Sequence, residues 1–548
     1  MPPSPPTTLA FDDSLLVKTT TTPAAIACQV AALGGELNVL EGELTLAPSE
    51  PAHEFVRTTI TTAAGADLIL DGPARGNLVH LAGDGAFTLQ SGPAVLSING
   101  GISNNDMNGA GLILEGGKIT GSGRLRNRGK LTLDSGTLGD SDTVAPPFEL
   151  DNAHDLFVTG AGTSRFAASI LNLENGLITA DAPIGMAGGA ILFNEGAVSL
   201  GERANIGVLP GSPSPQFRNA GLVVKRETGA AVISVHVANG SGDVDVRQGT
   251  LSFTGSIEEL FPNAAAPGTF TLAGGRYIIQ PLGTLTFNGR PVTRLAEGAS
   301  VRLLGSFSDF RPDRLSDRAS AEFGVRVAPA TPFVAEHESS LKLSPGGVLG
   351  TAPGGSPDAT FRDSSRVSGN GVVDRDARLL DASRAAPGYS PGELTFRSVA
   401  MLGGVLEIEL GGPTPVTEHD RITVVNHATL GGTLELSLLN GYAPPLGSAF
   451  TILAAGSVSG QFARVIQPPG LAQGLRLRPQ VSGSTVVLHV VQEADFNADG
   501  FLDFFDFLDF VACFEGDPCP PGADADFNAD GFVDFFDYLD FVAAFEGG

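Results

Sequence analysis

The predicted fold rests on a pattern that is clearest in the segment GLILEGGKITGSGRLRNRGKLTLDSGTLG, residues 111–139. Short runs in which apolar and polar residues alternate are separated by Gly, Asn or Asp. Alternation with a period of two places every second side chain on one face of a β-strand, whereas an amphipathic helix needs a period of about 3.6. The pattern continues from about Leu37 to Val491. It therefore predicts an all-β region built from many short strands.

A looser repeat within this region indicates how the strands are arranged. Three segments share an Asn-x-Gly turn: LRNRGKLTL at 125–133, LFNEGAVSL at 192–200 and FRNAGLVVK at 217–225. Asn127, Asn194 and Asn219 are 67 and 25 residues apart. These distances fit three rungs and one rung of about 22 to 25 residues. We expect Asn and Gly to form the corners because both accept left-handed backbone angles.

We therefore predict a right-handed parallel β-helix, or β-solenoid, with a small all-α, EF-hand-like module at its C-terminal end. The rival prediction, an array of β-sandwiches, would need domain-sized cores and clear linkers about every 100 residues. In a solenoid, Leu131 and Leu133 share one face of a strand and Thr132 takes the other, so both leucines should face the core together.

The predicted domain boundaries follow changes in composition. Residues 1–35 are rich in Pro and Thr, and we expect them to be poorly ordered. The solenoid should occupy residues 36–492, with an insertion or long loops at 306–370, where Arg, Pro and Ser are concentrated. Residues 494–548 should form the C-terminal module.

Charge and composition exclude several classes of protein. The chain of 548 residues has a net charge of −27, which disfavours nucleic acid as a partner. Residues 495–548 contain 14 acidic residues, no Lys or Arg, and 13 of the 33 Phe. A solvated acidic tail would not carry so many Phe, so a cation site is the better interpretation. No apolar run is long enough to span a membrane, and the first residues do not resemble a secretory signal.

Sequence phrases near the end of the β-region resemble a known class of protein. RAAPGYSPGELTF at 384–396 is followed by GGVLEIELGG, LGGTLELSLLNGY and AFTILAAGSVSGQF. These phrases look like the closing rungs of autotransporter-like bacterial β-solenoid passenger proteins, over about residues 370–491. The resemblance implies an extracellular parallel β-helix and does not by itself imply catalysis.

Two copies of a calcium-loop pattern lie in the C-terminal segment. Acidic and amide side chains stand at loop positions 1, 3, 5, 9 and 12, and a backbone carbonyl is expected as the ligand at position 7. The predicted ligands are Asp495, Asn497, Asp499, Phe501, Asp503 and Asp506 in the first loop, and Asp526, Asn528, Asp530, Phe532, Asp534 and Asp537 in the second. Gly500 and Gly531 at position 6 would permit the sharp turn. We therefore predict two Ca²⁺ sites and no other cofactor.

Each loop precedes one apolar helix, and the two copies agree at 20 of 23 positions. This duplicated half-motif resembles a dockerin domain of the Phe-rich, Cys-containing type, over residues 495–547. The resemblance implies attachment to a protein partner, cohesin-like or another surface receptor. Loop positions 10 and 11 carry Phe in both copies and no basic residue follows, which departs from dockerins that bind cohesins and leaves the partner unidentified.

The remaining features of this segment are the phenylalanines and the cysteines. We expect the Phe set 504, 507, 510, 514, 535, 541 and 545 to form a core between two antiparallel helices. Ala544 of the second copy replaces Cys513, so Cys513 and Cys519 are not metal ligands, and we expect a local disulfide between them, which fits an oxidising compartment.

No catalytic motif stands out in the sequence, and we predict no catalytic residues. The leading hypothesis is a non-enzymatic, extracellular or cell-surface solenoid of structural or adhesin type, anchored by the calcium-binding module. The alternative is a carbohydrate-active solenoid enzyme that degrades polysaccharide and is tethered by the same module. A surface groove with three or more acids within ~5 Å of one another beside a Lys, Arg or His would favour the alternative. Glu407 and Glu409 share one strand face, where we expect solvation.

Overall fold

The computed structural model describes residues 8–47, 51–90, 94–140, 148–212, 214–264, 268–520, 523–528 and 531–547. The predicted fold class is confirmed, since the chain forms a parallel β-solenoid with a small helical module at its C-terminal end. The chain divides into two compact units. The first comprises Met1–Gly268, Ala273–Pro291 and Gly305–Asp309, and the second comprises Thr269–Leu272, Val292–Leu304 and Phe310–Gly548.

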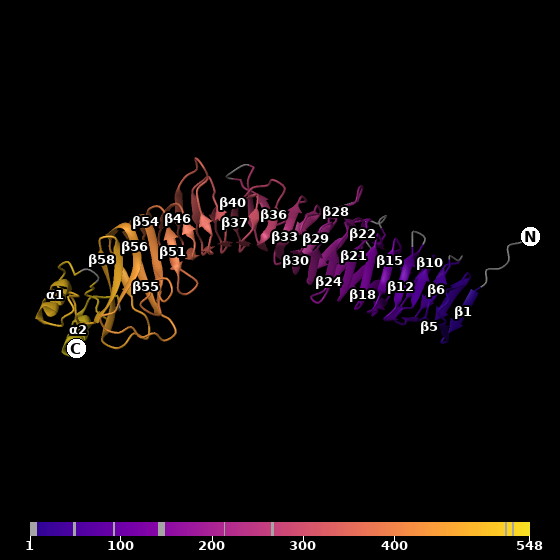
Figure 1. Cartoon of the computed structure of the whole chain (residues 1–548), viewed down its shortest axis with the longest axis horizontal. Helices are drawn as coiled ribbons and strands as arrows, with labels where there is room; N and C mark the ends of the chain where they lie inside the picture. Colours follow the sequence, from indigo (N-terminus) through magenta and orange to yellow (C-terminus); the bar gives the residue numbers. More distant parts are fainter. Residues whose placement is uncertain are drawn as a thin grey trace, which may run out of the picture. The chain divides into compact units, whose positions relative to one another are not determined.

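Through most of the first unit each turn supplies three short strands, and each strand pairs in parallel with the strand three places further along the chain (Figure 1). Two successive turns consist of β15 (Gly111–Glu115), β16 (Lys118–Gly121) and β17 (Arg124–Asn127), then β18 (Lys130–Asp134), β19 (Thr137–Gly139) and β20 (Glu149–Asn152). Equivalent positions of successive turns therefore lie directly above one another.

This stacking builds a continuous aliphatic core. The register pairs Leu112 with Leu131 and Leu114 with Leu133. Leu131 and Leu133 are completely buried, while Thr132 between them is partly exposed. The prediction that both leucines face the core is confirmed, and the period-two pattern follows from the inward and outward alternation of the strands.

A ladder of buried asparagines runs along the first unit. Each Asn donates from its side-chain nitrogen to the side-chain oxygen of the Asn one turn later, at 2.6 to 2.7 Å. The members are Asn105, Asn127, Asn152, Asn172, Asn194, Asn219 and Asn239. Three rungs separate Asn127 from Asn194 and one rung separates Asn194 from Asn219, as the sequence spacing predicts.

The prediction that these asparagines form corners because they accept left-handed backbone angles is wrong. Asn127, Asn194 and Asn219 are not among the described residues with positive φ, and they are buried. Their amides bond to one another because a buried amide needs partners for both its oxygen and its nitrogen. The glycines that follow serve close approach. A Cβ on Gly129 would lie 2.0 Å from the carbonyl oxygen of Met107 in the previous turn.

The prediction of poor order for residues 1–35 is wrong for residues 8–35, whereas residues 1–7 lie outside the described residues. Strands β1 (Thr8–Asp12) and β2 (Leu15–Thr19) pair in parallel with β4 (Gln29–Leu33) and β5 (Glu36–Glu41). The Thr-rich composition suits strands because β-branched side chains pack well on a pleated surface.

The prediction of an insertion or long loops at 306–370 is also wrong. One column of the second unit stacks parallel strands through this segment. Its strands are β38 (Ser300–Leu303), β41 (Ser320–Phe323), β44 (Ser340–Leu343), β47 (Arg366–Gly369), β50 (Arg384–Pro387), β53 (Val405–Leu410) and β55 (Thr433–Leu438). The Arg and Ser residues of this segment lie on outward positions and in turns, so they do not interrupt the stack.

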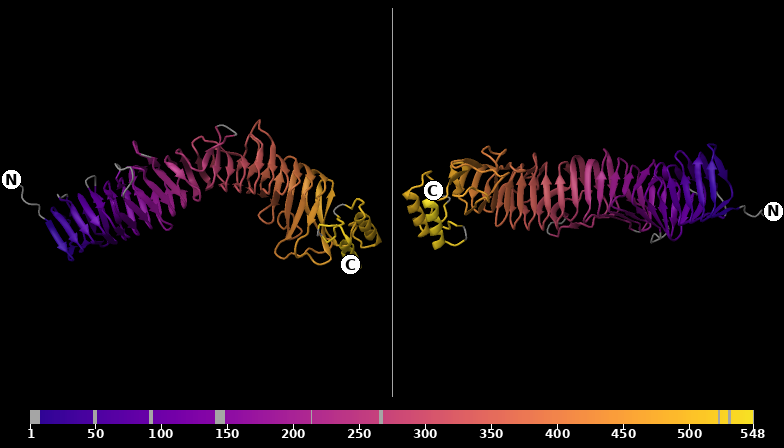
Figure 2. Two further views of the ribbon diagram at one scale, coloured as in Figure 1. Left: turned by 180° about the vertical axis from the view of Figure 1, so that it is seen from behind. Right: turned by 90° about the horizontal axis from the view of Figure 1, so that it is seen from below.

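The last strands change direction before the helical module begins. β59 (Thr485–Gln492) is antiparallel to both β56 (Ala449–Gly460) and β58 (Leu475–Ser482). Helices α1 (Phe504–Phe514) and α2 (Phe535–Gly547) follow and lie beside each other (Figure 2, yellow). Neither these nor any other helix in the described part of the chain is long and apolar enough to cross a membrane.

Candidate metal centre

The first predicted calcium loop is a compact turn that leads into α1. Asp503 caps the helix by accepting the backbone N–H of Phe505 at 2.8 Å. The carboxylate of Asp506, at position 12, reaches back into the loop and accepts the N–H groups of Asn497 at 3.1 Å and Asp503 at 2.9 Å. Asp506 is completely buried. The start of the helix thus places the position-12 carboxylate inside the loop.

Asp495, at position 1, is the least satisfied acid of this loop. Its side chain is buried, with the residue 3% exposed, and Oδ2 accepts the N–H of Gly500 at 3.1 Å. Oδ1 is buried without a hydrogen-bond partner among the described residues. Burial and then the nearby Asp506 carboxylate raise the pKa of Asp495. Two buried carboxylates therefore lie close to each other, and an oxygen of one of them has no partner in the part of the chain that the structure describes.

The side chains at positions 3 and 5 curl over the loop backbone. Asn497 Oδ1 accepts the N–H of Asp499 at 3.0 Å, and Asp499 Oδ1 accepts the N–H of Phe501 at 2.9 Å. Gly500 has a φ of 88°, which is the conformation expected at position 6. A loop of this shape turns oxygen atoms inward, and oxygen is the ligand that a hard cation such as Ca²⁺ prefers.

The second loop repeats the geometry of the first. Asp537 accepts the N–H groups of Asn528 at 3.1 Å and Asp534 at 2.8 Å, and Asp526 accepts the N–H of Gly531 at 2.9 Å. Asp537 is also completely buried. Asp530, the predicted ligand at position 5, lies outside the described residues. Asp526, Asn528, Asp534 and Asp537 of the second loop thus come together as their counterparts do in the first.

The core of the module is aromatic. Phe510 of α1 and Phe541 of α2 are both buried, and their rings stack with centroids 4.0 Å apart. Phe496 and Phe527, which precede position 3 of the two loops, pack against this pair. A disulfide joins Cys513 of α1 to Cys519. These contacts connect the two loops through a single shared core.

The prediction that Phe504 and Phe535 belong to this core is wrong. Both stand at the first position of their helices and are more than 60% exposed. The Phe residues at loop positions 7, 10 and 11 are all 63% to 71% exposed, namely Phe501, Phe504, Phe505, Phe532, Phe535 and Phe536. Phe501 and Phe532 would therefore serve a cation through their backbone carbonyls only. Six exposed Phe side chains are an unusual number for so small a module.

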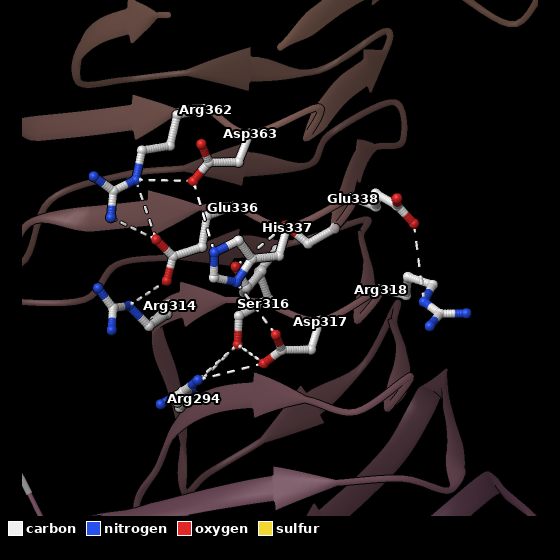
Figure 3. A network of polar contacts seen from close by, with 12 residues as sticks. Arg294, Arg314, Ser316, Asp317, Arg318, Glu336, His337, Glu338, Arg362 and Asp363 are labelled. Carbon is white, nitrogen blue, oxygen red and sulfur yellow. Dashed lines mark hydrogen bonds and ion pairs between the residues drawn. The ribbon is translucent and has the colours of Figure 1, made fainter. Parts of the chain in front are cut away.

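A second group of acidic side chains lies in the solenoid, at the turns after successive rungs of the second unit (Figure 3). Glu336, His337 and Asp363 bring ligand-type atoms within 4.8 Å of one another. Glu336 is already paired with Arg314 at 3.2 Å and Arg362 at 2.6 Å. This network is neutralised by its own arginines, so it offers a cation much less than the C-terminal loops do.

A groove of about 510 Å³ on the second unit tests the enzyme alternative. Its acidic lining residues are Glu407, Glu409, Asp420 and Glu435, and its basic lining residues are Lys342 and Arg366. Glu407 binds Arg366 at 2.8 Å and Arg384 at 2.6 Å, and the same Arg384 nitrogen binds Glu435 at 2.9 Å. Glu407 is thus held in ion pairs instead of being solvated as expected. The groove thus brings several acids and two basic residues to one place, as the alternative requires, but the arginines pair with the carboxylates of Glu407 and Glu435, which is typical of a structural ion-pair network.

Sequence reasoning missed one residue at the first loop, Arg478 of β58. Its side chain contacts the backbone of this loop, although the residue lies outside the predicted module. The alternation in LRLRPQVS places Arg476 and Arg478 on one face of the strand, but no local pattern shows what that face contacts.

No protein-family model matches the chain, and no curated protein matches it. The class that the fold itself defines is a parallel β-solenoid protein with a small C-terminal helical module.

Proposed function

We propose that the chain is an extracellular or cell-surface solenoid of structural or adhesin type, attached to a partner protein by a calcium-binding, dockerin-like module. The buried carboxylate of Asp495, with one oxygen unpartnered and Asp506 nearby, supports the calcium site. Burying an ionised carboxylate without compensation is costly. A divalent cation bound to these oxygens removes the repulsion and supplies the missing partner.

The residues that would hold the two ions are those that the loop pattern predicts. In the first loop these are the side chains of Asp495, Asn497, Asp499 and Asp506 and the carbonyl of Phe501, with Asp503 acting through water. The second loop would use the equivalent residues, including Asp530. The chemistry that calcium supplies here is charge neutralisation, because oxygen ligands of this type form structural sites in many extracellular modules.

The proposed partner surface is the set of six exposed Phe residues at loop positions 7, 10 and 11. The module carries 14 acidic residues and no basic ones, so we expect the partner to present an apolar patch with a basic rim. A cohesin-like protein or another surface receptor would fit this description. The disulfide between Cys513 and Cys519 suits an oxidising compartment, as an extracellular location requires.

For the solenoid we propose a display or adhesive role, since stacked rungs offer a long continuous surface for contacts. Polysaccharide remains a candidate ligand of that surface. The carbohydrate-active enzyme is the second candidate function, and the groove lined by Glu407 is the place to test it. If the ion pairs of Glu407 are structural, the Glu407→Gln variant and the unmutated chain should degrade polysaccharide to the same extent. Loss of polysaccharide breakdown in Glu407→Gln would instead support the enzyme.

Titration calorimetry on the full chain tests the calcium sites. The proposal predicts two bound Ca²⁺ ions, and Asp495→Ala and Asp526→Ala should each remove one binding event. Asp540→Ala is the matched control, because it deletes an exposed acid of α2 outside both loops. Absence of any calcium binding, or equal losses in all three variants, would overturn the proposed function.

A further inference from the structure

Arg478 connects the end of the solenoid to the first loop. The residue is 5% exposed, and Nη1 donates to the carbonyl oxygen of Asp495 at 2.7 Å. Nη2 donates to the carbonyl oxygen of Phe496, and the guanidinium lies over the ring of that Phe, 5.7 Å from its centroid. One buried side chain therefore holds the backbone of loop positions 1 and 2. Only the planar fork of Arg presents two donors in this geometry.

The positive charge of Arg478 also stabilises the first loop. Residues 495–548 contain no Lys or Arg, so any basic group beside the first loop must come from elsewhere in the chain. Arginine side chains stay charged at neutral pH, and the buried guanidinium of Arg478 lies near the carboxylates of Asp495 and Asp506. A buried cation beside buried carboxylates offsets part of their mutual repulsion.

We infer that Arg478 is a positioning residue that keeps the first loop folded on the solenoid when no cation is bound. It fixes the backbone at Asp495 and Phe496 and supplies the counter-charge that the module lacks. The first site thus belongs to the full chain, because a module cut off after β59 would lose this support. The inference deepens the proposed function and rests on it for the identity of the cation.

Amide exchange in the full chain tests this role directly. Five amides of the first loop donate to its own carboxylates and amide oxygen, namely those of Asn497, Asp499, Gly500, Phe501 and Asp503. In the presence of chelator, Arg478→Met should speed their exchange by tenfold or more. Arg464→Met, which removes an exposed Arg from β57, is the matched control and should change nothing. Equal exchange in the two variants would overturn the inference.

Calcium binding gives a second measurement. In an Asp526→Ala background, where only the first site remains, Arg478→Met should weaken calcium affinity by about tenfold, and Arg478→Lys should restore part of it. In an Asp495→Ala background Arg478→Met should have no effect. Unchanged affinity in the first background would overturn the inference while leaving the calcium site intact. Faster loop exchange in a chain that binds no calcium would overturn the proposed function alone.

Solenoid amides of β44 serve as the internal check on folding. They should exchange equally in every variant, because β44 makes none of the contacts of Arg478. Faster exchange in β44 of Arg478→Met would show a general loss of stability and would overturn the specific role.

Discussion

The asparagine ladder of the first unit and the pair Asp495 and Asp506 of the first C-terminal loop are both buried polar groups, but they differ in how their atoms are satisfied. Asn172 accepts from Asn152 and donates to Asn194, each at 2.7 Å, so both ends of its amide are used. In the loop, Asp495 keeps one buried oxygen without a partner among the described residues. An amide is both donor and acceptor, whereas an ionised carboxylate can only accept.

This difference separates structural from ligand-dependent polar sites. A row of amides can extend through any number of rungs, since each member satisfies the next. A row of carboxylates cannot satisfy itself, and it needs backbone N–H groups, a basic side chain or a cation. In the loop, the N–H of Gly500 bonds to Asp495 Oδ2 and Arg478 bonds to the backbone carbonyl of Asp495, so among the described residues Asp495 Oδ1 still has no partner.

Removal of calcium should produce the largest difference in amide protection between the asparagine ladder and the C-terminal module. With chelator, we expect the amide protection of α1 and α2 to fall, because the uncompensated carboxylates oppose folding of a module with a small core, while Arg478 keeps part of the first loop folded. The asparagine ladder should keep its protection under the same conditions. At 100 times the dissociation constant each ion would add about 2.7 kcal/mol. Hydrogen exchange followed by mass spectrometry reads both regions in one experiment.

The control is the same measurement with excess Mg²⁺, which prefers a smaller octahedral site and should protect the helices less. Equal protection of α1 and α2 with and without chelator would show that the module satisfies its own carboxylates, as the ladder satisfies its amides.

Breaking the ladder should be the next largest effect. Asn172→Ala leaves Asn152 and Asn194 each short of a partner and opens a cavity, so we expect a loss of about 3 to 5 kcal/mol in the free energy of unfolding. The exposed Asn99→Ala is the control and should cost less than about 0.5 kcal/mol. Urea denaturation monitored in the first unit gives the comparison. A small cost for Asn172→Ala would mean that water replaces the missing amide.

A cavity in the apolar core beside the ladder should lower the free energy of unfolding. Leu131→Ala removes a fully buried side chain stacked on Leu112, and we expect a loss of about 2 to 4 kcal/mol. Thr132→Ala on the outer face should stay within about 0.5 kcal/mol. Similar losses from the two variants would show that the inward and outward faces are not distinguished in solution.

Much of the solenoid could be predicted from the sequence because period-two alternation records which face of a strand is buried. The spacing of Asn127, Asn194 and Asn219 also predicted the correct number of rungs between these three residues. Their chemistry was misjudged, since Asn before Gly in a short motif usually indicates a turn, and the stacking partners are about 20 to 25 residues away. Composition misled at 306–370, because outward Arg and Ser leave the inward positions of a strand unchanged.

The candidate site was predictable where its geometry is local. The twelve-residue spacing places Asp506 back in its loop, and Gly500 takes the expected positive φ. What could not be predicted is the contact with Arg478, which depends on how β58 meets the module. The exposure of Phe504 and Phe535 was also missed, because helical periodicity alone does not show which face of a short helix has a neighbour.

Asp420 can be compared directly with Asp495, because it is a buried carboxylate whose two oxygens both have partners. It is 1% exposed and accepts the N–H groups of Gly392 at 2.8 Å and Glu409 at 3.0 Å. Burial nevertheless raises its pKa to about 7, against the opposing effect of these two bonds. A raised pKa means that the protonated form is favoured in the folded state. The contribution of Asp420 to stability is therefore greatest below pH 4, and it declines as the pH rises from about 4 to 7.

Asp420→Asn isolates this contribution, because the amide does not titrate. One amide edge of Asn would face a backbone N–H, so the variant should be less stable than the wild type at pH 4.5 by about 1 to 2 kcal/mol. The stability of the wild type relative to the variant should fall by about 3 kcal/mol between pH 4.5 and pH 8, as Asp420 ionises in the folded state. Thermal unfolding of both proteins across this range, at constant calcium, measures the difference. If the two curves run parallel, hydrogen bonds from the backbone are sufficient to keep a buried carboxylate ionised, and the unpartnered oxygen of Asp495 becomes the feature that decides which buried acids need a cation.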